Sequence, residues 1–512
     1  MKIEKKLKFS LVYDENVESY FTKNNIDYKN YHLTAKTLDA RGASRGKKPS
    51  YHYEYILIEQ DKINNEFIHE LVSDEVKQKV QEKLQSSPFE PIIIGLGPAG
   101  LFAAYTLMKY GVKATILERG KPVHSRMRDI AQFWRKGKLD SDSNVCFGHG
   151  GAGLFSDGKL ITRVKSPYIK NVMSTLVSYG AHPSIVYESN PHLGSNKIRK
   201  IIENMVEDME RSGHDFLNSF NVNKLQIENK MIHSLENDKG EKVEGTHFLL
   251  AAGHSATNLY YELNRNEVAL AQKDFAIGVR IEHPRKVMQK LQYGDFSNDE
   301  RLPTVRYRLS YHDHEEDRGG FSFCMCPGGY VLSSGTDVDG LVTNGMSNSK
   351  HNSPWSNSAI VCTIKAGEDF DSKNLMSGLE FQRNMEKTFY NFSVANASGK
   401  EIPACYLTEF MHGKLNSDIL PTNSCPSGVV KAPLYEMLPA QVTKHLRQSF
   451  EKFNHQIKGF IHSQAILYAP ETRTSSPLMI KRDKETLKSL NVSNLFPAGE
   501  GAGYAGGITS AA

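Results

Sequence analysis

The sequence predicts an α/β protein in which one parallel-sheet domain is assembled from two separated stretches of the chain. Three observations lead to this prediction. Residues 90–120 follow the order strand, glycine turn, helix, strand, which is the repeating unit of a parallel sheet. A second buried strand, "HFLLAAG", ends at residue 253. Residues 494–512 then return to a strand, a glycine turn and the start of a helix.

The opening 88 residues differ from the rest and predict a small α+β domain. The stretches "LKFSLVY" and "YHYEYILIEQ" are rich in aromatic and β-branched residues, which favours strands. Residues 65–85 carry apolar side chains at helical spacing, including Phe67, Leu71 and Val76. The sequence "SSP" at 86–88 ends this pattern.

The first glycine motif, "GLGPAG" at residues 95–100, lies between a short apolar strand and a helix. In such a motif Gly95 permits the tight turn, Gly97 lets the backbone approach a pyrophosphate, and Gly100 lets the helix pack on the sheet. The helix N-terminus then presents unpaired N–H groups to the phosphates. Glu118 ends the next strand, where an acidic residue binds the hydroxyls of an unphosphorylated ribose. The complete context predicts a dinucleotide site.

A second match, "GHGGAG" at 148–153, lacks the strand and the helix of such a unit. Five glycines within residues 148–158 favour a loop that lies against a ligand, and a flexible turn is the alternative.

The third match, "GAGYAG" at 501–506, follows a strand and precedes the start of a helix, but no second strand follows it in this sequence. It is therefore better suited to hold a second region of the ligand that the first motif binds. Glu500, just before these glycines, is a candidate for a hydrogen bond to a hydroxyl group. A bipartite dinucleotide fits this arrangement, and FAD fits it best, with its ADP half at the first motif and its flavin half at the third.

The strand-rich stretch 275–465 holds no further fingerprint, and its candidate reactive groups stay ambiguous. In "FAIGVRIEHP", Arg280 and Glu282 either line a substrate cavity or lie on a solvated strand face. The sequence "CMC" at 324–326 is either a redox pair, because alternate strand residues face the same side, or two buried structural thiols. Beyond this stretch, Arg473 either binds an anionic group or the flavin carbonyls, or holds a turn. The acid–base residue stays unassigned.

Composition limits the possible partners and the compartment. A net charge of +5 is too small to predict nucleic-acid binding by itself, and the basic cluster at 41–48 is either a solvated loop or a contact for an anionic partner. Six cysteines in so long a chain are typical of reduced thiols. "HDH" at 312–314, taken with these cysteines, matches no familiar metal site, so no metal is expected. The N-terminus does not read as a secretory signal and no apolar run reaches 18 residues, so we expect a cytoplasmic protein without a membrane span.

Seven motifs in order resemble a bacterial family of FAD-dependent dehydrogenases, often described as NAD(FAD)-utilising and placed in the glutathione-reductase-like class of flavoproteins. They are "IIGLGPAGLFAAYTL", "NVCFGHGGAGLFSDGKL", "LLAAGHSA", "FAIGVRIEHP", "SFCMCPGG", "ETRTSSPL" and "LFPAGEGAGYAGGI". The resemblance covers roughly residues 90–512. It implies that the first motif meets the pyrophosphate, that Glu118 meets the adenosine ribose, and that Val222 touches the adenine through its backbone.

The resemblance further implies that Glu500 holds the ribityl or pyrophosphate side, where related flavoproteins more often use aspartate, and that the helix after Gly507 points at the N1–O2 edge of the flavin. The candidate cofactor-binding residues are Gly95, Gly97, Pro98, Ala99, Gly100, Glu118, Arg119, Arg126, Gly150, Gly151, Gly153, Asp157, Val222, Ala252, Gly253, Gly499, Glu500, Gly507 and Ile508.

The expected fold is thus a discontinuous, glutathione-reductase-like Rossmann domain that binds FAD at 89–274 and 466–512, a strand-rich α+β substrate domain at 275–465, and a small α+β domain at 1–88. The expected function is an FAD-dependent oxidoreductase that transfers hydride to or from a small molecule. Alternatives are a flavoprotein acting on RNA and a non-catalytic FAD-binding interaction protein. The electron donor stays open between a transiently bound NAD(P)H, a partner protein and the substrate itself, because no second complete fingerprint provides a nicotinamide domain.

Overall fold

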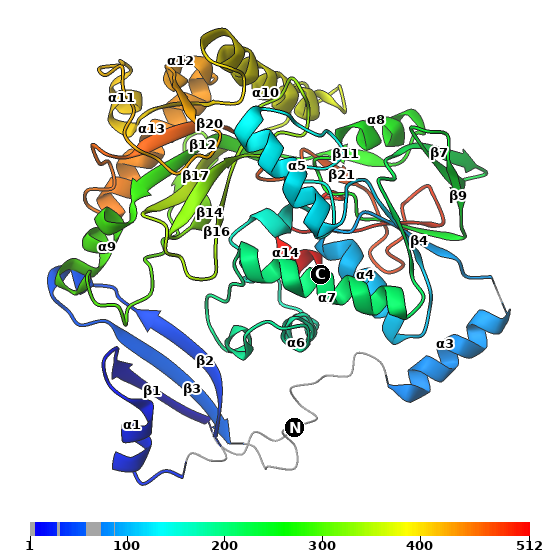
Figure 1. Ribbon diagram of the computed structural model, residues 1–512, viewed down its shortest axis with the longest axis horizontal. Coiled ribbons are helices and arrows are strands. Elements are labelled where there is room, and N and C mark those ends of the chain that lie inside the picture. The colour runs from blue at the N-terminus through cyan, green and yellow to red at the C-terminus, as the bar shows by residue number, and fades with distance from the viewer. Residues whose placement is uncertain (1–5, 28–30, 58–72, 87) are drawn as a thin grey trace.

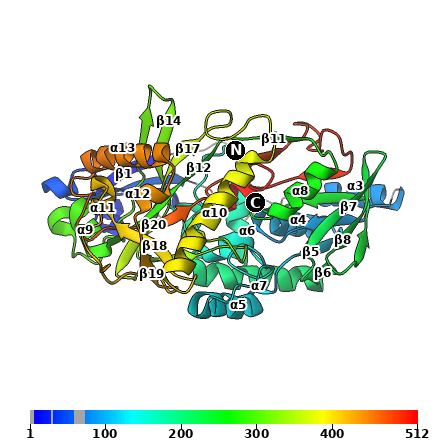
Figure 2. The same cartoon turned by 90° about the horizontal axis from the view of Figure 1, so that it is seen from above.

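The structure is a computed structural model that describes residues 6–27, 31–57, 73–86 and 88–512. A parallel sheet and a larger, mostly antiparallel sheet lie side by side along the long axis of the molecule, and the C-terminus lies between them (Figure 1, Figure 2). The mixed α/β class expected from the sequence is confirmed.

The five-stranded sheet has the order β22-β10-β4-β5-β6, and its strands pair in parallel. Numbered along the chain, this is the 3-2-1-4-5 order of doubly wound nucleotide-binding sheets. Because β22 pairs directly with β10, this sheet is built from two stretches of the chain. The residues of the larger sheet lie between these stretches in the sequence. Its strands are β4 (Pro91–Ile94), β5 (Thr115–Glu118), β6 (Asp215–Asn218), β10 (His247–Leu250) and β22 (Leu495–Pro497).

Both faces of this sheet are covered, which explains why the sequence of β4 is wholly apolar. Ile93 packs into a core formed with α4, α6 and α7, whereas Ile92 and Ile94 pack into a second core with α8 and a small antiparallel sheet. The covering elements are α4 (Pro98–Lys109), α5 (Val123–Lys136), α6 (Ile169–Ser178), α7 (Ser195–Arg211), α8 (Thr257–Arg265), β7 (Val222–Glu228), β8 (Met231–Asn237) and β9 (Lys242–Glu244).

The seven-stranded sheet has the order β13-β14-β17-β12-β20-β18-β19, in which β18 and β19 alone pair in parallel. It includes β20, so the sheet continues past the predicted boundary at 465. The strands are β12 (Phe275–Pro284), β13 (Ser310–Asp313), β14 (Arg318–Cys326), β17 (Trp355–Ile364), β18 (Ile402–Tyr406), β19 (Val429–Lys431) and β20 (Ile466–Glu471).

The two faces of β12 pack differently. Ile277, Val279 and Ile281 point into a core with α13 (Ala440–Gln456). On the other face, Arg280 is fully buried and donates through Nε and Nη2 to the carboxylate of Glu471, at 2.9 Å each. Glu282 is buried as well and accepts a hydrogen bond from Tyr468.

Both interpretations of Arg280 and Glu282 are therefore wrong: neither residue lines a cavity and neither is solvated. Each is buried because another polar side chain of the same sheet face satisfies it, which the alternation of β12 alone does not reveal.

The remaining elements join these sheets. They are α9 (Arg285–Tyr293), α10 (Ser377–Asn396), α11 (Leu407–His412), α12 (Leu434–Met437), α14 (Ile508–Ala511), and the two-stranded pairs β11 (Leu270–Gln272) with β21 (Leu478–Ile480) and β15 (Gly329–Ser333) with β16 (Thr343–Ser347). Among the described residues, no helix is both long and apolar enough to span a membrane.

The N-terminal region is a three-stranded antiparallel sheet with one helix, built from β1 (Lys6–Val12), α1 (Val17–Lys23), β2 (Tyr31–Asp39) and β3 (Ser50–Leu57) in the order β1-β3-β2. The helix expected at 65–85 is described only from Asp74, as α3 (Asp74–Ser86), and its predicted apolar positions Phe67 and Leu71 lie outside the described residues. In Figure 1, α3 lies apart from this sheet, and its Gln81 donates to the Tyr110 carbonyl oxygen at 2.9 Å, next to the parallel sheet.

The basic loop at 41–48 docks the N-terminal sheet onto the larger sheet. Ala43 is buried in the core that surrounds α9 and α13. Arg41 pairs with Asp39, and Lys48 pairs with Asp14. The loop thus has a packing role.

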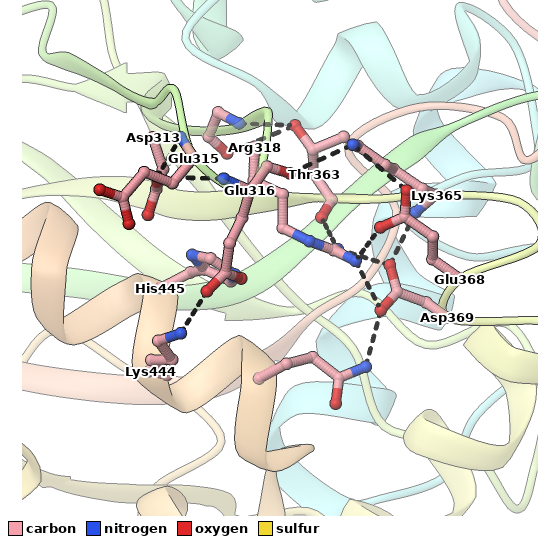
Figure 3. A network of polar contacts seen from close by, with 12 residues as sticks. Asp313, Glu315, Glu316, Arg318, Thr363, Lys365, Glu368, Asp369, Lys444 and His445 are labelled. Atoms are coloured by element: carbon pink, nitrogen blue, oxygen red, sulfur yellow. Dashed lines mark hydrogen bonds and ion pairs between the residues drawn. The ribbon is translucent and has the colours of Figure 1, made fainter.

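An ion-pair network lies at the start of β14 in the larger sheet, and it gives a testable prediction (Figure 3). Arg318 donates to Asp369 and to the carbonyl oxygen of Thr363, and its side chain and that of Asp369 are 8% and 2% exposed. We expect Arg318→Met to destabilise the protein by about 3 kcal/mol, because it leaves a buried carboxylate without its cation. The measurement is the midpoint of thermal unfolding, which should fall by several degrees.

The control is Arg301→Met, since Arg301 makes a similar paired contact with Asp299 but is 59% exposed. An exposed pair of this kind contributes little, so its midpoint should stay near that of the wild type. Equal midpoints for the two variants would contradict a stabilising role for the Arg318 network.

Candidate cofactor-binding site

A cavity of about 380 Å³ lies at the carboxyl ends of β4, β5, β10 and β22 and faces residues of the larger sheet. Its volume is within the ~300–1,000 Å³ of ligand sites, and its position matches the crevice where doubly wound sheets bind nucleotides. Most of the predicted cofactor residues line it: Gly95, Gly97, Pro98, Ala99, Glu118, Arg119, Gly151, Gly153, Val222, Ala252, Gly253, Gly499, Glu500, Gly507 and Ile508.

The first glycine motif forms one end of the cavity. Gly95 has a φ of +96°, a conformation that other residues rarely adopt, and Gly97 is the N-cap of α4. Gly100 lies behind the wall: a Cβ there would come within 1.9 Å of the Gly95 carbonyl oxygen. Gly100 therefore permits the close packing of α4 on the turn and is not exposed to the cavity.

Glu118 binds the backbone around the first motif. Its carboxylate accepts hydrogen bonds from the N–H groups of Leu96, Gly120 and Gly148 at 2.7, 2.8 and 2.9 Å. A carboxylate has about four acceptor positions, so these donors leave room for about one hydroxyl of a ligand. Glu118 thus links the glycine turn to the second glycine loop. The sequence motif gives no indication of this role.

Arg126 is a predicted site residue that the structure does not place on the cavity. Its guanidinium is fully buried in α5 beneath the second glycine loop. It donates to the carbonyl oxygens of Asn144, Val145, Gly148, His149 and Gly151 at 2.7–3.3 Å. Burial lowers the pKa of Arg126 to about 10, which still leaves it charged near neutral pH. Arg126 thus shapes the loop from behind.

The second glycine loop reaches the cavity through Gly151 and Gly153. Gly151 begins a short 3₁₀ helix (Gly151–Phe155), and a Cβ on it would lie 3.0 Å from the Cα of Gly97. The flexible-turn alternative does not describe this loop, because the Gly150 N–H donates to the Leu96 carbonyl oxygen at 2.9 Å and holds the loop against the first motif. Gly150 faces away, toward Ile202 of α7.

Asp157 is likewise predicted as a cofactor residue and lies behind the cavity wall. It is 1% exposed, hydrogen-bonds Ser347, and lies 3.1 Å from His351 and 3.8 Å from Lys159. Although burial raises the pKa of Asp157, the hydrogen bond from His351 and the charge of Lys159 outweigh it, so the pKa is below its usual range. Asp157 therefore orients Lys159, whose side chain does line the cavity.

The C-terminal stretch forms the wall next to the first motif, where a Cβ on Gly499 would lie 3.0 Å from the Cβ of Ala99. Burial raises the pKa of Glu500 to about 7, and its carboxylate lies 3.5 Å from Nδ1 of His254. Burial and the charge of Arg473 lower the pKa of His254 to about 4, so this ring is neutral at neutral pH. Helix α14 begins directly after Gly507, and Ile508 lines the cavity.

Glu500 gives a prediction about pH and stability. The folded-state pKa of Glu500 lies above its ordinary value of 4.5, so ionising this carboxyl lowers the free energy of unfolding. The destabilisation is absent below about pH 4.5, grows between about pH 4.5 and 7, and is complete above about pH 7. The full difference is at most about 3 kcal/mol, and partial exposure reduces it. We expect Glu500→Gln to raise the melting temperature at about pH 8 and to leave it unchanged at about pH 4.

Differential scanning fluorimetry of the wild type, of this variant and of the exposed control Glu485→Gln measures the effect. A gain at both pH values, or the same gain in the control, would contradict the raised pKa of Glu500.

The larger sheet supplies a cavity wall that the sequence motifs did not identify. It includes Phe323 and Cys324 of β14 and Glu471 of β20, and Asn344 of β16 and Arg473, just after β20, continue it. The guanidinium of Arg473 is held by Glu386 at 2.7 and 2.9 Å and by Thr336 at 2.6 Å. It therefore holds neighbouring segments together and borders the cavity, and its binding of an anionic group or of the flavin carbonyls stays a prediction.

The reactive groups considered in "CMC" and "HDH" are separated. Cys324 lines the cavity and Cys326 is buried beside it, whereas His312 is half-exposed on β13, where it pairs with Asp317. Over the described ranges, no cluster of three or more His, Cys, Asp or Glu side chains is arranged to hold a metal ion.

Comparison with known proteins gives a family for most of the chain. The family described as "FAD-dependent protein, C-terminal domain-like" matches residues 274–474. A protein of Clostridium beijerinckii, itself described only as uncharacterised, is 38% identical over 425 residues, which is 82% of this chain and 78% of that protein.

Solved structures also match at low similarity. CtdE in complex with FAD is 12% identical over 81% of this chain and 78% of its own, with a TM-score of 0.29. The oxygenase of 2-methyl-3-hydroxypyridine-5-carboxylic acid is 10% identical over 83% and 80%, with a TM-score of 0.30.

Proposed function

The chain belongs to the family of FAD-dependent proteins that share this C-terminal domain, and we propose that it is an FAD-binding oxidoreductase whose cofactor lies along the cavity between its two sheets. One observation carries the proposal. The glycine turn after β4 and the glycine-rich stretch after β22, far apart in sequence, open onto the same cavity. Each half of a bipartite dinucleotide can then contact glycine backbone, where no side chain blocks its approach.

The residues present fit such a ligand. Gly97 and Gly151 leave a side-chain-free gap beside the N-terminus of the twelve-residue helix α4, where N–H groups favour a pyrophosphate. Glu118 has acceptor capacity for a ribose hydroxyl, and Val222 borders the same end. Glu500 borders the same cavity, and we assign the flavin half to its side in the predicted glutathione-reductase-like arrangement.

Bound FAD would supply two-electron transfer, which no side chain of the chain supplies alone. The chain would bind and orient it, exclude water from the cavity, and hold a carboxyl at Glu500 that exchanges a proton near neutral pH. The substrate domain would be the larger sheet, whose residues form the opposite wall. Hydride exchange with a small molecule is the reaction class that we assign, and the electron donor is a nicotinamide, a protein or the substrate.

The test is an anaerobic titration of the purified protein with NADH and NADPH in turn, followed by the visible absorbance of oxidised flavin. Rapid bleaching by either nucleotide supports a reductase with that donor. If neither bleaches the flavin, a screen of small-molecule reductants follows. Flavin that no reductant turns over would contradict an oxidoreductase and support a non-catalytic FAD-binding protein.

A further inference from the structure

Two cysteines of β14 lie together at the cavity wall. Cys324 lines the cavity, and Cys326, two residues later, is fully buried. The thiol of Cys326 donates to the carbonyl oxygen of Cys324 at 3.3 Å, and the two side chains are close enough to shift each other's pKa. One of the two thiols is accessible from the cavity.

The backbone at Cys324 is unusual. Its φ is +45°, in the left-handed region that non-glycine residues seldom occupy, and the pairing of β14 with β17 changes register between Phe323 and Cys326. Strained backbone of this kind costs about 1–3 kcal/mol and concentrates at functional sites. Here the irregularity lies at the residue whose side chain meets the cavity.

Cationic groups surround this pair. Lys159 donates to the Met325 carbonyl oxygen, and Arg280 lies 3.5 Å from the carbonyl oxygen of Cys324. The hydrogen bond from Cys326, opposed by burial and supported by the charges of Lys159 and Arg280, lowers the pKa of Cys324 to about 6. The same hydrogen bond and burial raise the pKa of Cys326 well above its usual value. Cys324, which lines the cavity, is thus the more acidic of the two thiols.

Other cysteines of the chain differ. Burial raises the pKa of Cys362, Cys405 and Cys425 to about 12 in each case, and none of these residues lines the cavity. Cys146 does line it, where its thiol donates to the Ser334 carbonyl oxygen at 3.8 Å. Cys146 is therefore the matched single thiol for experiments on the pair.

We propose that Cys324 and Cys326 form a redox-active dithiol–disulfide pair in the cofactor cavity, with Cys324 as the exposed, attacking thiol and Cys326 as the resolving one. The inference rests on the proposed function, because the flavin is the pair's electron partner. When the pair is oxidised, one Sγ–Sγ bond forms and the two thiols together lose two protons and two electrons. The electrons pass to oxidised flavin and the protons to flavin and solvent. The reverse step returns them and breaks the bond.

The first experiment measures the thiols of the holoprotein directly. Protein is equilibrated anaerobically in a series of reduced and oxidised glutathione buffers, quenched in acid, alkylated and analysed by peptide mass spectrometry. We expect Cys324 and Cys326 to lose alkylation together and to appear as one disulfide-linked peptide, in the wild type and in Cys146→Ser alike. Full alkylation of both in every buffer, or a disulfide from Cys324 to Cys146, would overturn the inference.

The second experiment counts electrons. An anaerobic dithionite titration of the oxidised wild type should consume about twice the reducing equivalents per flavin that Cys324→Ala and Cys326→Ser consume. Equal consumption by the wild type and these variants would overturn the inference. If a variant does not fold, the wild-type ratio of equivalents to flavin decides alone. A protein without flavin absorbance would instead contradict the proposed function, so the two failures are distinguishable.

Discussion

Replacing Gly97 by alanine is expected to weaken FAD binding at least about 100-fold while the protein stays folded. Gly97 has ordinary backbone angles, φ −71° and ψ −175°, and a Cβ there would meet the Cα of Gly151 at a comfortable 4.0 Å. The fold therefore tolerates the methyl group, but the group projects into the gap that we assign to the pyrophosphate. A displaced phosphate loses charge-assisted hydrogen bonds worth about 1.5–3 kcal/mol each.

A second glycine of the same motif provides the contrast. In Gly100→Ala the new Cβ would lie 1.9 Å from the Gly95 carbonyl oxygen, so that variant should lose stability itself. Circular dichroism and FAD titration of both variants separate the two effects. Wild-type FAD affinity in a folded Gly97→Ala protein would contradict the placement of the pyrophosphate.

Replacing Arg126 by methionine is expected to have the largest effect on both stability and cofactor binding. The guanidinium is the donor for five carbonyl oxygens of residues 144–151, and all of these contacts are buried. Leaving a buried acceptor unsatisfied costs about 1–3 kcal/mol, so the loss of several at once exceeds what a local rearrangement recovers. The loop should then move away from Gly97, and FAD binding should fall with it.

The matched control is Arg128→Met, two residues further along α5 and exposed to solvent. Thermal unfolding and FAD titration of both variants are the measurements. We expect the Arg128 variant to resemble the wild type and the Arg126 variant to melt many degrees lower. If the Arg126 variant kept its stability but lost FAD, a direct cofactor contact, as first predicted from the sequence, would replace the positioning role.

The sequence could predict what local backbone chemistry determines. The glycine turn at 95–100, the acid at the end of β5 and the return to the sheet at 494–512 are short patterns whose geometry hardly depends on distant residues. It could not assign Arg126 correctly, because its five acceptors belong to a loop that folds back over α5. A buried cation and a ligand-binding cation look the same in sequence.

The cavity wall from the larger sheet was harder still to predict. Cys324 reaches the cavity only because β14 pairs with β17 and changes register there. Lys159 is oriented by Asp157, which His351 from a distant stretch contacts in turn. The pattern of alternate cysteines did indicate that two thiols face one side. Which cavity they border depends on packing between the two sheets, which no local pattern encodes.

The most direct test of the proposed FAD site is the FAD stoichiometry of the folded protein. It is measured by absorbance of the purified protein and by titration of flavin-depleted protein with FAD. We expect one FAD per folded chain, and strongly reduced FAD binding by a Gly97→Ala protein that keeps its fold. A folded wild-type protein that carries no flavin and binds none when FAD is added would contradict it.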